Sequence, residues 1–165
     1  MKPSIYLAIM LGVALLAACS KDDTSSTTDT VPQRNIPSGT IPIPGWDVAP
    51  DYDYTSSMTA VVDVDLTSTY PDITPVDWQV DTADLLAAFA GEDCIGVTSP
   101  TQSENLFFLY ISSPSESSAD ITLRYYSARL RNVFLADSIL HFENGARMGS
   151  VAEPLTPAFV EFKTE

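Results

Sequence analysis

The chain has 165 residues, of which 22 are Asp or Glu and 8 are Lys or Arg, which gives a formal net charge of −14. Because nucleic-acid binding takes its affinity from Lys and Arg, this charge argues against a nucleic-acid partner. The 2 cysteines are too few for a disulfide framework or a cysteine zinc site, and the length suits a single folded domain behind a leader and a linker.

The first predicted element is a signal peptide over residues 1–18. Lys2 supplies its positive start, and the apolar run that follows is shorter than the about 20 residues of a membrane-spanning helix. The closing string resembles the lipobox read by lipoprotein signal peptidase: Leu16-Ala17-Ala18-Cys19. The resemblance implies cleavage before Cys19 and lipidation of its thiol, so the membrane is an expected partner through a lipid anchor. An ordinary secretory signal or an uncleaved anchor stays open.

The string after Cys19 bears on the location of the mature protein. Ser20-Lys21-Asp22-Asp23 resembles the Lys-acidic-acidic export tag of surface lipoproteins of Bacteroidota. The resemblance implies residence at the outer membrane, facing the cell exterior. If the string is only a solvated charge cluster, the periplasmic face of the outer membrane is expected instead.

Residues 19–45 comprise the cysteine and a predicted linker rich in Ser, Thr, Asp and Pro, without helical or strand periodicity. Such a composition cannot bury enough apolar surface to offset the entropy of ordering. The part over residues 31–44 contains four prolines and is expected to form a semi-stiff polyproline stalk. The folded domain is therefore predicted to span residues 46–165.

The domain has the pattern of short β-strands separated by Ser, Pro and Gly turns. In residues 58–66 apolar and polar side chains alternate, which predicts a strand with one buried face. Asn144-Gly145 predicts a tight hairpin turn. The other predicted strands are 85–90 and 94–98 around a turn at 91–93, 106–112 as an apolar run buried on both faces, 121–126, 133–136, 138–142, and an edge strand around 158–162.

Because no convincing crossover helix separates these strands, the expected fold is all-β, an antiparallel immunoglobulin-like β-sandwich, with a barrel as the related alternative. The run from Asp84 to Val97 resembles a β-sandwich module of secreted and surface proteins of Bacteroidota, with an Ala-Phe-x-Gly-x-x-Cys-x-Gly hairpin after an Asp. The resemblance covers residues 54–99 and departs at Ile95, where related modules often carry Arg. It implies an accessory or binding module that brings no catalytic residues.

The residues of this hairpin also have a direct physical interpretation. Gly91 is expected to adopt a left-handed turn conformation, and Gly96 to let a backbone or a large ring approach the strand. Phe89 and Cys94 are expected to fill the hydrophobic layer between the sheets, with the Cys94 thiol buried and inert.

Catalytic and metal chemistry find little support in the sequence, and no cofactor or metal is expected. The only histidine, His141, lies in a predicted strand without a nucleophile motif elsewhere. Asp47, Asp51 and Asp53 are close enough in sequence to hold calcium, but they lack an Asp-x-Asp-x-Asp-Gly loop and are interpreted as surface charge. The count of acidic residues does leave room for the carboxylate pair of a small glycoside hydrolase.

Binding is better supported, because several aromatic residues fall at predicted loop or strand-end positions. The candidate ligand contacts are Trp46, Tyr52, Tyr54, Tyr70 and Trp78, although such rings also seal the ends of sandwiches. Three strings resemble the Asp-Ser/Thr-apolar O-glycosylation sequon of Bacteroidota: Asp29-Thr30-Val31, Asp81-Thr82-Ala83 and Asp137-Ser138-Ile139.

The expected function is that of a lipid-anchored, non-enzymatic protein of the cell surface that binds a glycan or a surface protein or serves a larger surface complex. Two alternatives stay open. One is a small surface glycoside hydrolase with a carboxylate pair, and the other is a structural spacer or assembly subunit.

Overall fold

The computed structural model describes residues 35–48, 53–74, 77–101, 105–113 and 120–163, apart from the side chains of residues 53–55. The chain divides into a unit of Met1–Pro32, which lies outside the described residues, and a unit of Gln33–Glu165, to which every described element belongs. The predicted signal peptide, Cys19 and the string Ser20 to Asp23 therefore lie outside the described part, and their roles stay predictions.

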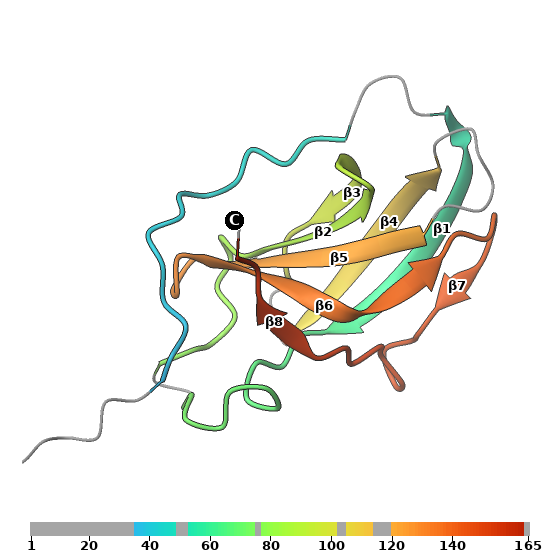
Figure 1. The fold of residues 1–165 in the computed structure, drawn as a ribbon. Helices are drawn as coiled ribbons and strands as arrows, with labels where there is room; N and C mark the ends of the chain where they lie inside the picture. Colours follow the sequence, from blue (N-terminus) through green and yellow to red (C-terminus); the bar gives the residue numbers. More distant parts are fainter. Residues whose placement is uncertain (1–34, 49–52, 75–76, 102–104, 114–119, 164–165) are drawn as a thin grey trace, which may run out of the picture. The chain divides into compact units, whose positions relative to one another are not determined.

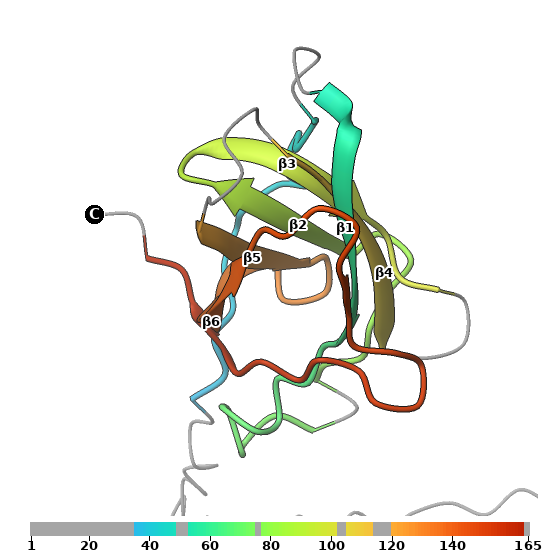
Figure 2. The ribbon, with the colours of Figure 1, turned by 90° about the vertical axis from the view of Figure 1, so that its right-hand side faces the viewer.

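Two β-sheets packed face to face form the fold (Figure 1, Figure 2), which confirms the predicted all-β sandwich. One sheet has three strands in the order β4-β1-β7, and the other has five in the order β3-β2-β5-β6-β8. Neighbouring strands pair antiparallel except β1 and β7, which pair parallel. The strands are β1 (Asp53–Asp63), β2 (Leu85–Ala90), β3 (Asp93–Thr98), β4 (Leu106–Ser113), β5 (Asp120–Ser127), β6 (Asn132–His141), β7 (Arg147–Met148) and β8 (Phe159–Glu161).

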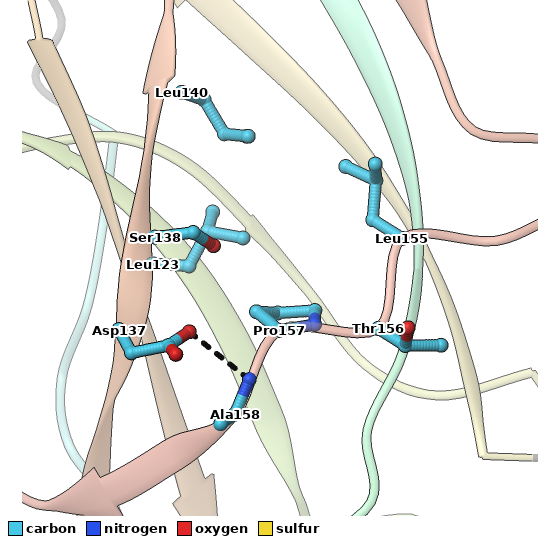
Figure 3. Close-up of a pocket in the computed structure, with 8 residues that line it drawn as sticks. All are labelled: Leu123, Asp137, Ser138, Leu140, Leu155, Thr156, Pro157 and Ala158. Carbon is cyan, nitrogen blue, oxygen red and sulfur yellow. Dashed lines mark hydrogen bonds between the residues drawn. The ribbon is translucent and has the colours of Figure 1, made fainter.

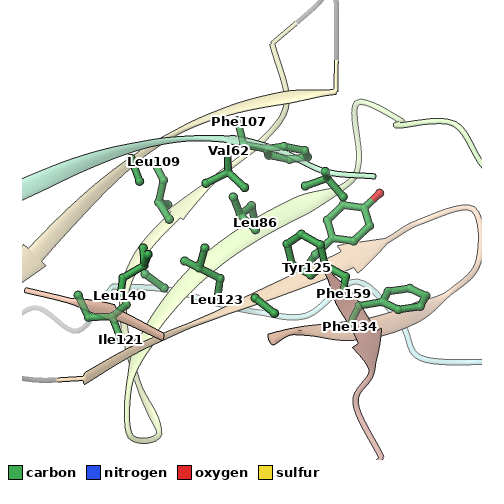
Figure 4. Packing of buried hydrophobic residues seen from close by; sticks show 14 of the residues in the cluster. Val62, Leu86, Phe107, Leu109, Ile121, Leu123, Tyr125, Phe134, Leu140 and Phe159 are labelled. Carbon is green, nitrogen blue, oxygen red and sulfur yellow. The ribbon is translucent and has the colours of Figure 1, made fainter. Parts of the chain in front are cut away.

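The hydrophobic core lies between the two sheets (Figure 4). The alternation in β1 is observed, because Met58, Ala60 and Val62 are buried while Thr59 between them is exposed. Large side chains of the other strands complete the core, among them Phe107, Leu109, Leu86, Leu123, Tyr125, Phe134 and Phe159. Fully burying one such side chain contributes about 1.5–3 kcal/mol, so this layer supplies most of the stability of the fold.

The two predicted glycine roles in the β2–β3 hairpin are confirmed. Gly91 opens the turn with a φ of 63°, in the left-handed region that glycine tolerates best. A Cβ atom at Gly96 would collide with the backbone carbonyl of Tyr110 in β4, so the glycine permits the expected close approach of two backbones. Figure 2 shows β3 curving from the five-stranded sheet toward β4 at this place.

Residues 132–141 form one strand rather than the two strands predicted around Asp137. Thr122 pairs with Ile139 and Arg124 with Leu135, so that one residue of β5 faces three of β6 between these pairs. This irregularity is a β-bulge, which bends a strand without ending it. The polar residues Asp137 and Ser138 mark the bulge and not a break between strands.

The predicted hairpin at Asn144-Gly145 is wrong, although Gly145 has the positive φ of a turn residue (78°). Ser57 of β1 holds this turn, since Gly145 N donates to Ser57 O (2.7 Å) and Ser57 N donates to the Asn144 side chain (3.1 Å). The chain is thereby directed across to the other sheet, where β7 pairs parallel with β1. The strand predicted around 158–162 is confirmed as an edge strand, β8, beside β6.

The structure differs from the predicted stalk over the described part of the linker. Gly39 N donates to Leu130 O and Ile41 N to Arg131 O, both at 2.9 Å, and the Tyr126 hydroxyl donates to Ile41 O (3.1 Å). Figure 1 shows residues 35–48 running along the domain as an extended segment. These residues are therefore attached to the sandwich instead of standing away from it. In the described part of the chain no helix is long and apolar enough to cross a membrane.

Candidate functional site

The outer face of the three-stranded sheet exposes two aromatic side chains. Phe108 and Tyr110 of β4 are 46% and 49% exposed, whereas the side chains between and beside them point into the core. The prediction of a run buried on both faces is thus wrong for β4. Residues two apart in a strand lie on one face, about 7 Å from each other, so the two rings form a row along the strand.

Strands β1 and β7 add polar and apolar neighbours to this row. Val61 pairs with Phe108, Thr59 pairs with Tyr110, and Arg147 of β7 pairs with Thr59 on the other side. We call the surface formed by these five residues the aromatic face. It is hollowed by a shallow depression of about 420 Å³ that all five side chains line. Rings, a hydroxyl group and a guanidinium group therefore meet on one open, rigid sheet surface.

A second depression, of about 390 Å³, lies at the end of the same β1–β4 pair where Asp63 pairs with Leu106. Its other walls are Asn105, Pro154 and the exposed side chain of Val151. The loop that carries Val151 leaves β7 at Gly149 and returns at residue 155, whose backbone N donates to Val61 O (2.9 Å). The aromatic face thus continues into a rim of mixed polarity.

The aromatic residues predicted as ligand contacts do not form one site. Trp78 is only 5% exposed, and its Nε1 donates to the Tyr125 hydroxyl (3.2 Å). Tyr70 packs on the core with its ring edge-on to Phe134, and its hydroxyl accepts a hydrogen bond from Glu161 N (2.7 Å). Both rings seal the sandwich, which is the alternative interpretation of such residues. Tyr52 lies outside the described residues, as does the side chain of Tyr54.

Trp46 is half-buried on the opposite side of the domain, on the outer face of the five-stranded sheet. Its ring meets Phe89 edge-on, with 5.7 Å between the ring centroids. Phe89 and Cys94 belong to this small outer cluster, so the prediction that they fill the layer between the sheets is wrong. In β2, Phe89 points outward by regular alternation, because Leu86 and Ala88 face the core. In β3, the bulge between the pairs Ala88–Gly96 and Phe89–Cys94 adds Ile95, which lies in the core, and so turns Cys94 to the outer face.

The same outer cluster holds a stacked guanidinium group. Arg124 lies 4.0 Å from the centroid of the Phe89 ring and 5.1 Å from that of Phe162, and its side chain is only 14% exposed. It also forms an ion pair with Glu92 (3.3 Å). Burial raises the pKa of the neighbouring Cys94 thiol, which agrees with its predicted inertness. Arg124 is therefore committed to packing and has little surface for a ligand.

A buried polar network joins the loop before β2 to the end of β5. The Asp84 carboxylate is fully buried and accepts hydrogen bonds from the Tyr125 hydroxyl (2.6 Å), from Ala128 N (2.7 Å) and from Asp81 N (3.0 Å). Burial raises the pKa of Asp84, and it raises that of Tyr125 well above its usual value. Because every acceptor bond of Asp84 goes to a structural group, the network fixes the fold and faces no open surface.

A side depression of about 410 Å³ lies between β6 and residues 155–158 (Figure 3). Leucine side chains line much of it, and Asp137 at its rim accepts a hydrogen bond from Ala158 N (3.1 Å). Ser138 of the sequon-like string is exposed here, and Thr82 of the second string is exposed in the loop before β2. The first string lies outside the described residues.

The remaining titratable groups do not gather into a reaction centre in the part of the chain that the structure describes. His141 Nδ1 contacts Asp120 Oδ1 at 2.9 Å on an exposed strand end. Within that same part there is no cluster of three metal-ligating side chains. Asp47 is exposed, Asp51 lies outside the described residues, and so does the side chain of Asp53, so the calcium interpretation stays untested.

The aromatic face is the functional candidate that sequence reasoning missed. The signal was present, because Phe108 and Tyr110 are two residues apart, and such residues share one face of a strand. It was hidden because their neighbours in β4 are apolar as well. Comparison of the chain with protein-family models, with curated proteins and with solved structures finds no match.

Proposed function

We propose that this protein is a lipid-anchored binding protein of the outer bacterial surface, and that its aromatic face binds a carbohydrate. The observation that carries the second part is the pair of half-exposed rings, Phe108 and Tyr110, side by side on a rigid sheet. Contiguous exposed apolar side chains with polar residues around them mark binding sites more often than single exposed side chains do. The anchor itself rests on the string Leu16-Ala17-Ala18-Cys19.

A carbohydrate fits this surface better than an apolar ligand does. One side of a sugar ring presents C–H groups, which pack against the negative face of an aromatic ring. The edges of the sugar carry hydroxyl groups, for which Thr59 and Arg147 offer hydrogen-bonding partners beside the rings. The depression is shallow and open, as needed for a chain of sugars that lies along the strands.

Affinity electrophoresis through gels containing a panel of polysaccharides tests the carbohydrate part. We expect at least one polysaccharide to retard the full chain in mild detergent, and the double variant Phe108→Ala, Tyr110→Ala to migrate unretarded. The matched control is Ile139→Ala with Val160→Ala, because these side chains are similarly exposed (54% and 43%) on the other sheet. Equal retardation of the wild type and the Phe108, Tyr110 variant, or no retardation at all, would refute the proposal.

Mass spectrometry of the protein taken from cells tests the anchor separately. We expect an N-terminal residue at position 19 that carries the mass of acyl chains, since two or more chains are needed for stable anchoring. An intact Met1 or an unmodified Cys19 would contradict the anchor. The hydrolase and assembly alternatives remain untested hypotheses.

A further inference from the structure

We infer that the carbohydrate bound by the aromatic face is an acidic polysaccharide, whose carboxylate groups Arg147 selects. This inference rests on the proposed carbohydrate-binding function and deepens it. Tyr110, Thr59 and Arg147 lie in one row across β4, β1 and β7. Adjacent strands are about 4.8 Å apart, so the guanidinium side chain begins about 10 Å from the backbone of Tyr110. A sugar stacked on the ring would place its edge toward Arg147.

The charge of the molecule makes an exposed arginine informative at this place. The chain carries 22 acidic and 8 basic residues, so exposed cationic groups are few. Among the described residues, Arg124 pairs with Glu92, and Arg131 donates to Thr40 O (3.4 Å). Arg147 and Arg129 are exposed and form no ion pair with any described residue, and of these two only Arg147 lines the aromatic face. A guanidinium group binds a carboxylate through two parallel hydrogen bonds, so it matches a uronic acid.

The place of Arg147 in the aromatic face sets the position of the ligand. Arg147 lies at the end of the face with Tyr110 and Thr59. An acidic sugar is therefore expected over Tyr110 and Thr59, with its carboxylate toward Arg147. At an ionic strength of 0.15 M the screening length is about 8 Å, so acidic residues farther than this from Arg147 act on the ligand only weakly.

The test compares polysaccharides that differ only in charge. Polygalacturonate, alginate and hyaluronate are each offered to the full chain in mild detergent, beside the methyl ester of the same polymer. Affinity electrophoresis at 0.15 M salt gives the ratio of the two affinities. We expect the wild type to bind the acidic form with about tenfold higher affinity or more, which is the gain expected from one bidentate hydrogen bond between charged groups.

Three variants locate this preference. Arg147→Gln is expected to reduce the ratio of the affinities for the acidic and the esterified polymer to about one. Arg147→Lys is expected to give an intermediate ratio, because lysine keeps the charge but cannot form the bidentate hydrogen bond. The control Arg129→Gln removes the same charge from an exposed position in the turn between β5 and β6, and it is expected to keep the full preference.

The outcomes separate the two proposals. Three results overturn the inference and leave the carbohydrate-binding proposal intact. The wild type could bind both forms equally, it could bind neutral polysaccharides only, or its preference could survive in Arg147→Gln. Loss of all binding in the Phe108→Ala, Tyr110→Ala variant together with a charge preference that depends on Arg147 supports both. Absence of binding to any polysaccharide removes both.

Discussion

The Asp84→Ala substitution removes the acceptor at the centre of the buried network. In the native protein the carboxylate accepts hydrogen bonds from the Tyr125 hydroxyl (2.6 Å), Ala128 N (2.7 Å) and Asp81 N (3.0 Å). Alanine offers no acceptor, so these donors must find water or remain unpaired. Tyr125 is fully buried and therefore has the poorest access to water.

The expected cost follows from the number of donors that lose their partner. A buried donor without an acceptor costs about 1–3 kcal/mol. Asp81 lies at the surface, so its N–H can bind water, which leaves the Tyr125 hydroxyl and Ala128 N to carry the cost. Two such groups give about 2–6 kcal/mol, partly offset because a carboxylate no longer has to be desolvated. We expect a net loss of about 3 kcal/mol from a total of about 5–15 kcal/mol.

Urea unfolding followed by tryptophan fluorescence measures this loss. Trp78 is a direct reporter, because its Nε1 donates to the same Tyr125 hydroxyl. With a slope of about 2 kcal/mol per molar urea, the midpoint is expected to fall by about 1.5 M. The slope itself should stay constant, since the same surface becomes exposed on unfolding.

Asp81→Ala is the matched control for this measurement. Its carboxylate is exposed and accepts one hydrogen bond, from Ala83 N (2.9 Å), so a loss of about 1 kcal/mol or less is expected. An Asp84→Ala variant no more destabilised than Asp81→Ala would show that the buried network contributes nothing specific to stability.

Three further predictions concern pH, packing and thiol reactivity. Burial raises the pKa of folded Asp84 above its unfolded value near 4, so its stabilising contribution is fully present below about pH 4 and is lost as pH rises through the folded pKa. The measurement is the difference between the urea midpoints of the wild type and Asp84→Asn. This difference should fall as the pH is raised from 4 toward 7, and a constant or rising difference would contradict the prediction. In the same assay Gly96→Ala should lower the free energy of unfolding by about 1–3 kcal/mol, because its Cβ meets the Tyr110 carbonyl. The control is Gly45→Ala, where a Cβ meets nothing within 4 Å, and it should change stability by less than about 0.5 kcal/mol. In a Cys19→Ser background the buried Cys94 should react with a thiol reagent only in urea, and rapid labelling of the native protein would show that the outer cluster opens.

The strands that the sequence predicted well are those with a visible difference between their faces. In β1 the apolar residues Met58, Ala60 and Val62 alternate with other residues, and the pattern identifies both the strand and its buried side. In β4 the core side chains and the exposed rings of Phe108 and Tyr110 are all apolar, so the same alternation gives no contrast in hydropathy. Only the pairing with β1 shows which of them face solvent.

The tertiary partners of turns and rings were beyond local patterns. Asn144-Gly145 has the right residues for a hairpin, yet its hydrogen bonds to Ser57 are made with a strand almost ninety positions away. Trp78 resembles a surface ring in sequence and is buried because Tyr125 supplies a hydrogen-bonding partner in the core. Fold class follows from periodicity, but the location of a binding surface depends on contacts between distant segments.

The attachment of residues 35–48 has a mechanical consequence. A force that pulls on the chain from its N-terminal side reaches the hydrogen bonds of Gly39 and Ile41 before it reaches any strand. These bonds can open one after another, at a lower load than a whole sheet edge would bear. Once freed, the 14 residues could span at most about 50 Å, so shear acting on the protein would first peel this segment from the domain and leave the sandwich intact.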